Sequence, residues 1–549
     1  MSKQKILSKG QLGFIPGNRT SDAHLILHNL IESYCKNKTK HIFGCFVDFE
    51  KAFDTLPRHK LFQKLLDLNI NGKFYDCLIS FYKKNESCVK IGYTISNSFL
   101  TNQGVKQGCI LSPLLFNIFL SDFQQEIDKT KNEPVLISQH EKLGCILWAD
   151  EILLMSESET GLQNMLNTLK LYVDNNGMKV NHKKTKIMIF NKNGRHIRKY
   201  FTLGVERIEC TREYKYLGFL VTPSGEINAG LNDLKDRAQR AFFNLKSKLG
   251  CLFQKHPTIS LKLFETLIKP ILLYCSDFWG ILKLPKTNPI EVVQNSIYKQ
   301  LLGVQRQTPT VGILLELGQI PLSTYAKKMA FKNWLRIAKQ KNSNNLVWKS
   351  YEYALSLNFI WPTQFKENLS KIGMADTFIN EQKNNELNNI FQRMCDIFHQ
   401  NAFADIKRPD SKLRTYSLIK SEIGMEKYIT ETNKVTDRIN LSRLRLSNHG
   451  LNIEKGRHNF TKKENRNCPF CPQNVEDEIH ATIECRLYTH LRKNLYTLLH
   501  IESPQFERLE PHVKFIILFS HMESNKIANY TTQLFELRIF ILNQHKNIA

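Results

Sequence analysis

Residues Gly144–Met155 read GCILWADEILLM, and this stretch decides how the first part of the chain folds. Two short apolar runs, Cys145–Trp148 and Ile152–Met155, flank the adjacent carboxylates Asp150 and Glu151. Each run is too short for an independent helix, so the pattern predicts a hairpin of two buried strands with acids at its tip. Because neighbouring carboxylates repel each other, we expect a positive charge close to them.

A third acid, Asp48, directly follows the apolar run Ile42–Val47 (IFGCFV). Asp48 and Asp150 would therefore both lie at strand ends, although they are far apart in sequence. Two divalent cations roughly 3.5–4 Å apart, held by carboxylate oxygens, can clamp the attacking and leaving oxygens of a phosphoryl transfer. The pattern predicts such a two-metal site on Asp48 and Asp150. The alternative is that both acids are ordinary surface residues.

The charge balance indicates the kind of partner. Lys and Arg total 77 of the 549 residues against 51 Asp and Glu, a formal net charge of +26. An excess of this size, spread along the chain, indicates nucleic acid as the partner, the alternative being a generically basic protein. No apolar run approaches the ~20 residues that span a bilayer, and the amino terminus lacks an apolar signal region. We therefore expect an intracellular protein with no membrane partner.

The order of the predicted elements up to residue 225 is strand, helix, helix, hairpin, helix and strand. This order indicates an α+β fold, with a mixed or antiparallel sheet and helices packed on it. From about Asn228 the pattern turns helical, and helices with basic faces continue to about Asn345. Residues 346–450 are predicted to be mixed helical and carry no clear chemistry.

Two polar segments between the apolar elements offer contacts to a ligand. The glycines of 103–108 (QGVKQG) would let a backbone approach a ligand closely, and the alternative is an ordinary connecting loop. A strand predicted over 178–190 carries three lysines, whose alternative role is a solvated face: Lys183, Lys184 and Lys186.

Near the end of the chain stands a compact set of metal-ligand residues: Cys468, Cys471, His480 and Cys485. Three cysteines and a histidine at this spacing fit a tetrahedral Cys3His zinc site. Aromatic and basic residues interleave with them: Phe470, Arg486, Tyr488 and Arg492. The pattern favours a structural zinc module that touches nucleic acid, in the manner of a zinc knuckle, over chance clustering.

Taken together, these blocks resemble the reverse transcriptase of LINE-type (non-LTR) retrotransposons, from about Gln11 through the zinc motif. Six blocks stand in the family's order: QLGFIPGNRTSDA (11–23), FVDFEKAFDTLP (46–57), NQGVKQGCILSPLLFNIFL (102–120), LWADEILLM (147–155), GMKVNHKKTKIM (177–188) and YKYLGFLVT (214–222). No single block decides the resemblance, but six in the right order do.

The resemblance implies a right-hand polymerase with a palm, a helical thumb and a small C-terminal zinc-knuckle-like module. The implied domains are partial fingers and palm at 1–225, thumb at 226–345, a helical connector at 346–460, the Cys3His module at 461–495 and a helical tail at 496–549. It also implies an intracellular location, in the nucleus and the cytoplasm.

The implied activity is RNA-directed DNA synthesis, in which a nucleotide is joined to a primer 3′-hydroxyl with two Mg²⁺ ions, or Mn²⁺ in their place. The partners would be an RNA template, a DNA primer or target, and dNTPs. Asp48 and Asp150 would be the metal ligands, and Glu151 would complete the catalytic acids. The implied nucleotide-binding residues are Phe49 through its backbone oxygen, Phe53 as a steric gate against the ribose 2′-hydroxyl, Gln107, Gly108 and Lys184. The implied primer grip is Tyr216, Leu217 and Gly218, and the alternative for Phe53 is plain core.

Two departures from the family's pattern support other readings. Glu151 stands where the family has aspartate, and Trp148 where a smaller aromatic residue is usual. Because catalytic constellations tolerate only about 0.5 Å of misplacement, the longer side chain of Glu151 would lower activity or change the metal preference. The chain also begins almost at QLGF, without the expected endonuclease domain and first finger strands. The alternatives are a truncated, catalytically impaired remnant that only binds nucleic acid, or a decayed element copy.

Overall fold

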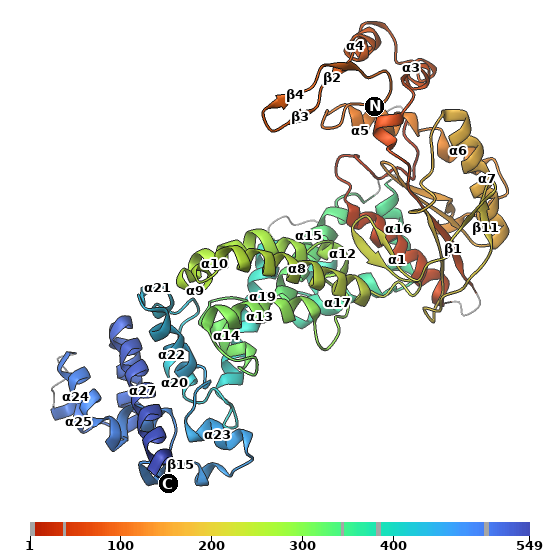
Figure 1. Ribbon diagram of the computed structural model, residues 1–549. Coiled ribbons are helices and arrows are strands. Elements are labelled where there is room, and N and C mark those ends of the chain that lie inside the picture. The colour runs from red at the N-terminus through yellow and green to blue at the C-terminus, as the bar shows by residue number, and fades with distance from the viewer. Residues whose placement is uncertain (1–5, 37–39, 342–344, 380–385, 499–503, 549) are drawn as a thin grey trace. The chain divides into compact units, whose positions relative to one another are not determined.

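The computed structural model describes residues 6–36, 40–341, 345–379, 386–498 and 504–548 (Figure 1). The chain divides into two units. Unit 1 comprises Met1–Asp233, Cys275–Leu284 and Ala326–Glu386, and unit 2 comprises Leu234–Tyr274, Pro285–Tyr325 and Leu387–Ala549. Helices combine with short antiparallel sheets, so the mixed helix-and-sheet character of the predicted fold is confirmed. Among the described residues, no helix combines the length and apolarity that crossing a bilayer needs.

A four-stranded antiparallel sheet forms the centre of unit 1. Its strands, in spatial order, are β10 (Lys186–Phe190), β1 (Ile42–Val47), β9 (Glu151–Ser156) and β8 (Cys145–Trp148). The predicted hairpin is therefore correct, with Ala149 and Asp150 at its tip. Because Val47 pairs with Ile152, the end of β1 lies at the same end of the sheet as that tip.

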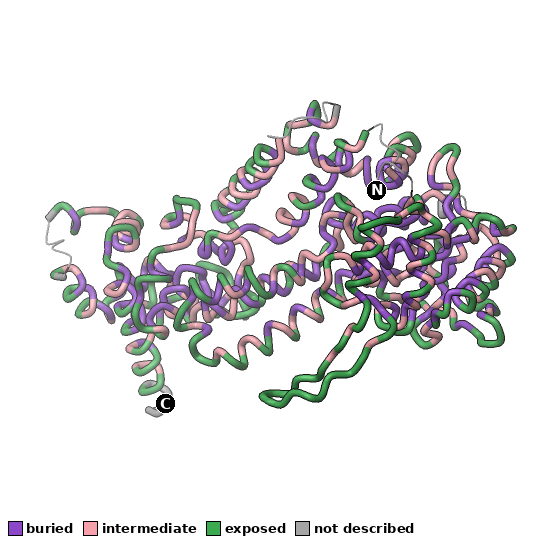
Figure 2. The backbone as a smooth tube through the Cα atoms, turned by 90° about the horizontal axis from the view of Figure 1, so that it is seen from above, coloured by how far each residue is buried: buried purple, intermediate pink, exposed green. Residues whose placement is uncertain are grey.

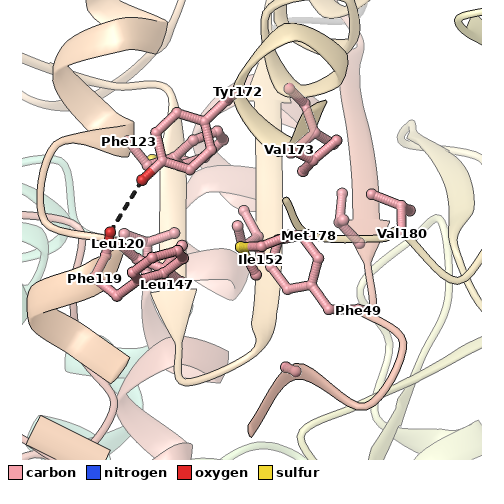
Figure 3. Close-up of a cluster of buried hydrophobic side chains, with 14 of the residues drawn as sticks. Phe49, Phe119, Leu120, Phe123, Leu147, Ile152, Tyr172, Val173, Met178 and Val180 are labelled. Carbon is pink, nitrogen blue, oxygen red and sulfur yellow. Dashed lines mark hydrogen bonds between the residues drawn. The ribbon is translucent and has the colours of Figure 1, made fainter. Parts of the chain in front are cut away.

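The sheet is buried on one face by α7 (Glu159–Asn176) and by α5 (Ser112–Phe119) and α6 (Phe123–Asp128). Figure 3 shows part of this core, with Phe49, Ile152 and Met178 among the packed side chains. Burying each such large apolar side chain contributes about 1.5–3 kcal/mol. Helix α7 ends at Asn176 and is capped by Gly177, whose φ of 66° favours glycine.

The strand predicted over 178–190 is wrong in its first half, because β10 begins only at Lys186. The Asn181 side chain accepts a hydrogen bond from the backbone N–H of Lys184 at 3.2 Å, and its carbonyl accepts one from Thr185 at 2.9 Å. These bonds close a turn of the kind that asparagine favours. Lys183 and Lys184 therefore lie in a turn, close to the end of β1.

Smaller antiparallel pairs complete the sheet structure of unit 1: β2 (Glu86–Ser87) with β5 (Phe99–Leu100), β3 (Lys90–Ile91) with β4 (Thr94–Ile95), β6 (Val135–Ser138) with β7 (Glu141–Leu143), β11 (Phe201–Leu203) with β12 (Glu206–Ile208), and β13 (Tyr214–Tyr216) with β14 (Phe219–Val221). The last pair contains the implied primer grip, Tyr216, Leu217 and Gly218. Its turn residues Leu217 and Gly218 both have positive φ, which is typical of a type I′ hairpin.

Buried and exposed residues alternate along the helices, as amphipathic packing requires (Figure 2). The remaining helices within unit 1 are α1 (Thr20–Lys36), α2 (Ala52–Thr55), α3 (Arg58–Asp67), α4 (Gly72–Tyr82), α12 (Ser276–Trp279), α16 (Leu346–Ser356), α17 (Ile360–Lys371) and α18 (Asp376–Ile379). Three further helices each have residues in both units: α8 (Asn228–Leu249), α15 (Leu322–Ala338) and α19 (Glu386–Ile406).

Unit 2 is mainly helical. Its principal helices are α10 (Pro257–Leu263), α13 (Pro289–Leu302), α14 (Thr310–Glu316), α22 (Val435–Arg445), α23 (Asn452–His458), α24 (Thr489–Leu498), α26 (Pro511–His521) and α27 (Ser524–Ile548). A buried ion network lies inside it: Arg445 contacts Glu316 and Glu426, each at 2.7 Å. Tyr428 also donates to Glu316 at 2.7 Å. Satisfied in this way, the buried charges fix how the helices pack.

Candidate active site and metal centre

Three carboxylates meet at one end of the four-stranded sheet. Asp48 follows β1, Asp150 lies at the hairpin tip, and Glu151 is the first residue of β9. Asp48 Oδ2 lies 3.3 Å from Lys184 Nζ, which is the positive charge expected beside the acids. This contact is an ion pair without hydrogen-bond geometry: among the described residues, that buried oxygen accepts no hydrogen bond. A divalent cation bound to this oxygen would take the place of the Lys184 ammonium as its partner.

The electrostatics of the acids also favour a cation. Burial raises the pKa of Asp150, and the charge of Asp48 raises it further, while Lys184 partly offsets both. Burial likewise raises the pKa of Glu151. Raised carboxyl pKa values mean that the ionised forms of these acids are disfavoured in the folded protein. A divalent cation bound between them would stabilise the ionised forms. Carboxylate oxygens are the ligands that Mg²⁺ and Mn²⁺ prefer, so the donor set fits.

Glu151 makes a contact that the sequence did not predict. Its Oε2 accepts a hydrogen bond from the backbone N–H of Leu217 at 3.3 Å, and this bond lowers the raised pKa of Glu151. Leu217 belongs to the turn between β13 and β14, the predicted primer grip. The extra methylene of glutamate therefore joins the acid hairpin to this turn.

The acid hairpin is braced by the segment 10–13. Leu12 N–H donates to the carbonyl of Leu147 at 2.9 Å, and Leu147 N–H donates to the carbonyl of Gly10 at 2.9 Å. The brace packs tightly, because a Cβ at Gly13 would lie 2.6 Å from the backbone nitrogen of Ala149. Ala149 itself has a φ of 54°, so the tip depends on its surroundings to hold a strained conformation.

Gly13→Ala is expected to displace the acid hairpin. The added methyl group meets backbone atoms of Trp148 and Ala149, which cannot move aside without shifting the tip. We expect a loss of roughly 1–3 kcal/mol in unfolding free energy, measured by urea denaturation. The control is Gly450→Ala, where the nearest atom is a flexible Lys455 carbon at 3.9 Å. Equal stability of the two variants would contradict the proposed brace.

A hollow of about 360 Å³ lies in the same unit. Its lining is Phe14, Phe53, Lys106, Gln107, Gly108, Cys109, Ile110, Ser112 and Pro113. Three of the predicted nucleotide-binding residues thus line one hollow, and Phe14 and Lys106 are further lining residues that the sequence did not single out. Phe53 stacks on Phe116 with ring centroids 4.8 Å apart, and Gln107 Nε2 donates to Asp54 Oδ1 at 3.0 Å.

The other predicted site residues are placed differently. Phe49 is only 4% exposed and its side chain packs in the core (Figure 3), so the predicted role can fall only to its backbone oxygen. Tyr216 is buried against the rings of Phe46, at 5.2 Å, and His24, at 5.4 Å. Lys184 lies at the acids rather than in the hollow.

The four predicted zinc ligands come together in unit 2, with their ligand atoms all within 4.8 Å of one another. Cys485 Sγ lies 3.8 Å from Cys468 Sγ and 3.9 Å from Cys471 Sγ. A tetrahedral site with zinc–sulfur distances of about 2.3 Å has sulfur–sulfur edges of about 3.8 Å. Neither nitrogen of His480 makes a hydrogen bond among the described residues, but Nδ1 lies 3.4 Å from Glu484 Oε2, so Nε2 is the nitrogen better placed to bind a metal. The donor set therefore fits zinc.

The motif is built on short local elements. Cys468 and Cys471 pair across the turn between β15 (Asn467–Cys468) and β16 (Cys471–Val475), and His480 opens a π-helical turn, His480–Glu484. Asp477 Oδ1 accepts the backbone N–H of His480 at 2.8 Å. Two buried carboxylates anchor the surroundings: Glu476 binds Arg538 at 2.7 Å, and Glu478 binds Arg414 at 2.7 Å.

Comparison with known proteins agrees with this geometry. Residues 1–221 match the family model described as reverse transcriptase (RNA-dependent DNA polymerase). That segment contains all three acids, the 360 Å³ hollow and the β13–β14 turn.

Three relatives carry the match to retrotransposons. The probable RNA-directed DNA polymerase from transposon BS of Drosophila melanogaster is 25% identical over 54% of this chain and 32% of its own length. The RNA-directed DNA polymerase from mobile element jockey of Drosophila funebris is 23% identical over 62% of this chain and 37% of its own length. A Pol polyprotein from a type-1 retrotransposable element R2 of Nasonia vitripennis is 23% identical over 41% of this chain and 23% of its own length.

These matches confirm the resemblance to retrotransposon reverse transcriptases. The chain spans about a third of the length of the first two relatives. Among solved structures, a telomerase from Candida albicans aligns with 64% of this chain and 56% of its own, at 14% identity. Its TM-score of 0.30 is too low to bear on the fold.

Proposed function

We propose that this chain is an RNA-directed DNA polymerase of a non-LTR retrotransposon, which joins deoxynucleotides to a primer 3′-hydroxyl. The observation that carries the proposal is the meeting of Asp48 and Asp150 at one sheet end, where a buried oxygen of Asp48 accepts no hydrogen bond from the described residues. The reverse transcriptase match over residues 1–221 supplies the reaction class.

In this proposal Asp48 and Asp150 would hold two Mg²⁺ ions, or Mn²⁺. Metal bound there would supply Lewis-acid chemistry toward the phosphates and the primer hydroxyl. Lys184 adds a positive charge beside the acids and would contact the phosphates of the nucleotide. Phe53 excludes the ribose 2′-hydroxyl, while Gln107 and the backbone of Gly108 shape the rest of the pocket.

Glu151 acts on the primer side. Because its carboxylate accepts the Leu217 N–H, it holds the primer grip (Tyr216, Leu217 and Gly218) against the acid hairpin. A primer end that rests on that turn would then lie at a fixed distance from Asp150. This role explains how the site tolerates glutamate where the family has aspartate.

The domain assignment follows from the same proposal. Residues 1–225 form the partial fingers and palm, 226–345 the thumb, 346–460 a helical connector, and 496–549 a helical tail. The module at 461–495 binds structural Zn²⁺ and contacts nucleic acid. The expected partners are an RNA template, a DNA primer or target, and dNTPs, in the nucleus and cytoplasm.

Primer extension tests the proposal. The wild-type protein is incubated with an RNA template, a labelled DNA primer, dNTPs and Mg²⁺ or Mn²⁺, with EDTA in a parallel reaction. Metal-dependent extension is expected. Binding of RNA that weakens steeply with salt, without any extension by a folded protein, would instead support the binding remnant.

Phe53→Val is expected to admit ribonucleotides. The smaller side chain opens space where the 2′-hydroxyl would lie, so the preference for dNTP over rNTP in kcat/KM should fall by about 10- to 100-fold. Single-nucleotide incorporation measures this ratio. The control is Phe62→Val, since Phe62 is a partly buried phenylalanine that does not line the hollow. An unchanged ratio in Phe53→Val would assign Phe53 to the core alone.

A further inference from the structure

The segment 191–212 of unit 1 forms a second, basic hollow, which the proposed mechanism does not use. It encloses about 570 Å³. Its lining is His196, Arg198, Lys199, Arg207, Glu209, Cys210, Thr211 and Arg212. None of these residues lines the 360 Å³ hollow or belongs to the acid site. Across 191–212 there are six Lys or Arg against two Glu.

The walls of this basic hollow are fixed by local bonds. The buried side chain of Asn191 donates to the carbonyl of Arg195 at 2.8 Å and accepts its N–H at 2.9 Å, which sets the loop after β10. The opposite wall is attached to the sheet edge, because Thr211 N–H donates to the carbonyl of Ile187 at 2.8 Å. Cys210 Sγ also contacts the carbonyl of Lys199 at 3.5 Å. The basic side chains are therefore presented on a defined surface.

Most of the positive charge in the hollow is not neutralised. Lys199 pairs with Glu159 at 2.9 Å, and Glu209, the one acid in the lining, pairs with Lys186 at 2.6 Å. The hydrogen bond from Lys186, with the nearby charges of Arg198 and His196, lowers the pKa of Glu209. Within the lining of this hollow, three guanidinium groups have no carboxylate of the described residues in ion-pair range: those of Arg198, Arg207 and Arg212. Arg198 Nε donates a hydrogen bond to His196 Nε2 at 3.3 Å, which leaves its charge without an acidic partner.

An exposed aromatic ring accompanies these charges. Tyr200 is 66% exposed, and the guanidinium of Arg207 lies 5.3 Å from its ring centroid. Guanidinium groups that have no carboxylate partner bind phosphate oxygens, and an exposed aromatic ring beside them offers a surface on which a base can stack. Together they have the composition of a single-strand binding surface rather than of a small-anion pocket.

We propose that this basic hollow binds the phosphodiester backbone of a single nucleic-acid strand, with a base stacked on Tyr200. It would be a contact separate from the catalytic acids. The inference rests on the proposed function only in that its ligand is a nucleic acid. Its test therefore uses Asp150→Asn protein throughout, so that a failure of polymerisation does not affect the result.

The test is fluorescence anisotropy with a labelled 30-nucleotide RNA, and with DNA of the same sequence, between 50 and 300 mM salt. The probe variant combines Arg198→Gln, Arg207→Gln and Arg212→Gln. A matched control removes the same charge from exposed lysines of unit 1: Lys129→Gln, Lys131→Gln and Lys366→Gln. Each lost phosphate contact lowers the slope of log K against log salt by about 0.7, so the probe variant should lose about 2 from the slope and about tenfold in affinity. The control should keep both, and thermal melts check that each variant is folded.

Two further arms identify the ligand. Tyr200→Ala should weaken strand binding about fivefold or more without changing the salt slope, because stacking releases no counterions. Equal losses in the arginine and lysine triple variants would overturn the proposal. So would loss of pyrophosphate binding, by calorimetry, with strand affinity unchanged, because that result would make the hollow a small-anion site. The proposal holds whether the hollow binds RNA more tightly than DNA or binds both equally. A preference for RNA would identify the strand as RNA.

Discussion

Asp150→Asn is expected to abolish primer extension, with a fall of about a thousandfold or more, while the protein stays folded. Asparagine keeps the size of the side chain but removes the charge that would hold a divalent cation beside Asp48. A loss of about 4 kcal/mol of transition-state stabilisation corresponds to this factor. Glu151→Gln should retain far more activity, because its amide oxygen can still accept the Leu217 N–H. Extension assays with both variants measure this contrast.

The same substitution should make the metal-free protein more stable at neutral pH. Burial and the charge of Asp48 raise the pKa of Asp150, so the folded state binds that proton more tightly than the unfolded state does. Ionisation of Asp150 therefore costs stability at neutral pH, and the cost disappears as pH falls through its raised pKa. Thermal melts in EDTA should show Asp150→Asn above wild type at pH 7.5, with the difference shrinking towards pH 5.

The control for these experiments is Asp174→Asn on α7. Asp174 is half exposed and pairs with Lys170 on the helix surface, so its loss should change stability by only a few tenths of a kcal/mol. Extension should be unaffected. An Asp150→Asn protein that extends primers like Asp174→Asn would exclude the two-metal assignment.

The acid site could be predicted from the sequence because its parts are local. A short apolar run with an acid close behind it is typical of a buried strand: Asp48 directly follows Ile42–Val47, and Asp150 follows Cys145–Trp148 after Ala149. The zinc ligands could also be predicted from the sequence, because their spacing within one segment places them together. In both cases the prediction rests on residues that are close together in the sequence.

What could not be predicted depends on register between distant segments. The hydrogen bond between Glu151 and Leu217 requires the β13–β14 turn to contact the acid hairpin, and no local pattern encodes that placement. The brace of Gly13 against Ala149 is a similar case. The buried pair of Arg445 and Glu316 was also missed, because charged side chains normally indicate a solvated surface.

Removal of zinc is expected to unfold the Cys3His module. Binding of a structural zinc ion contributes about 10–16 kcal/mol in small zinc domains, as much as the whole stability of many domains. Three of the four ligands lie on short elements, the strands β15 and β16 and the turn His480–Glu484, and Cys485 directly follows that turn. Such elements have little core of their own. The ion pairs Glu476–Arg538 and Glu478–Arg414 join this region to the rest of unit 2. We expect Cys471→Ser, or a strong chelator, to release zinc and to lower the melting temperature of unit 2.

Zinc content by atomic absorption and melting curves with and without chelator measure this effect. Cys251→Ser is the matched control, because Cys251 is exposed and lies outside the motif. Zinc release should also increase as pH falls, since the ligands bind the metal only when deprotonated. One zinc per chain in wild type and in Cys251→Ser, and none in Cys471→Ser, is the expected result. A protein that melts identically with and without zinc would show that the anchors at Glu476 and Glu478 hold the module by themselves.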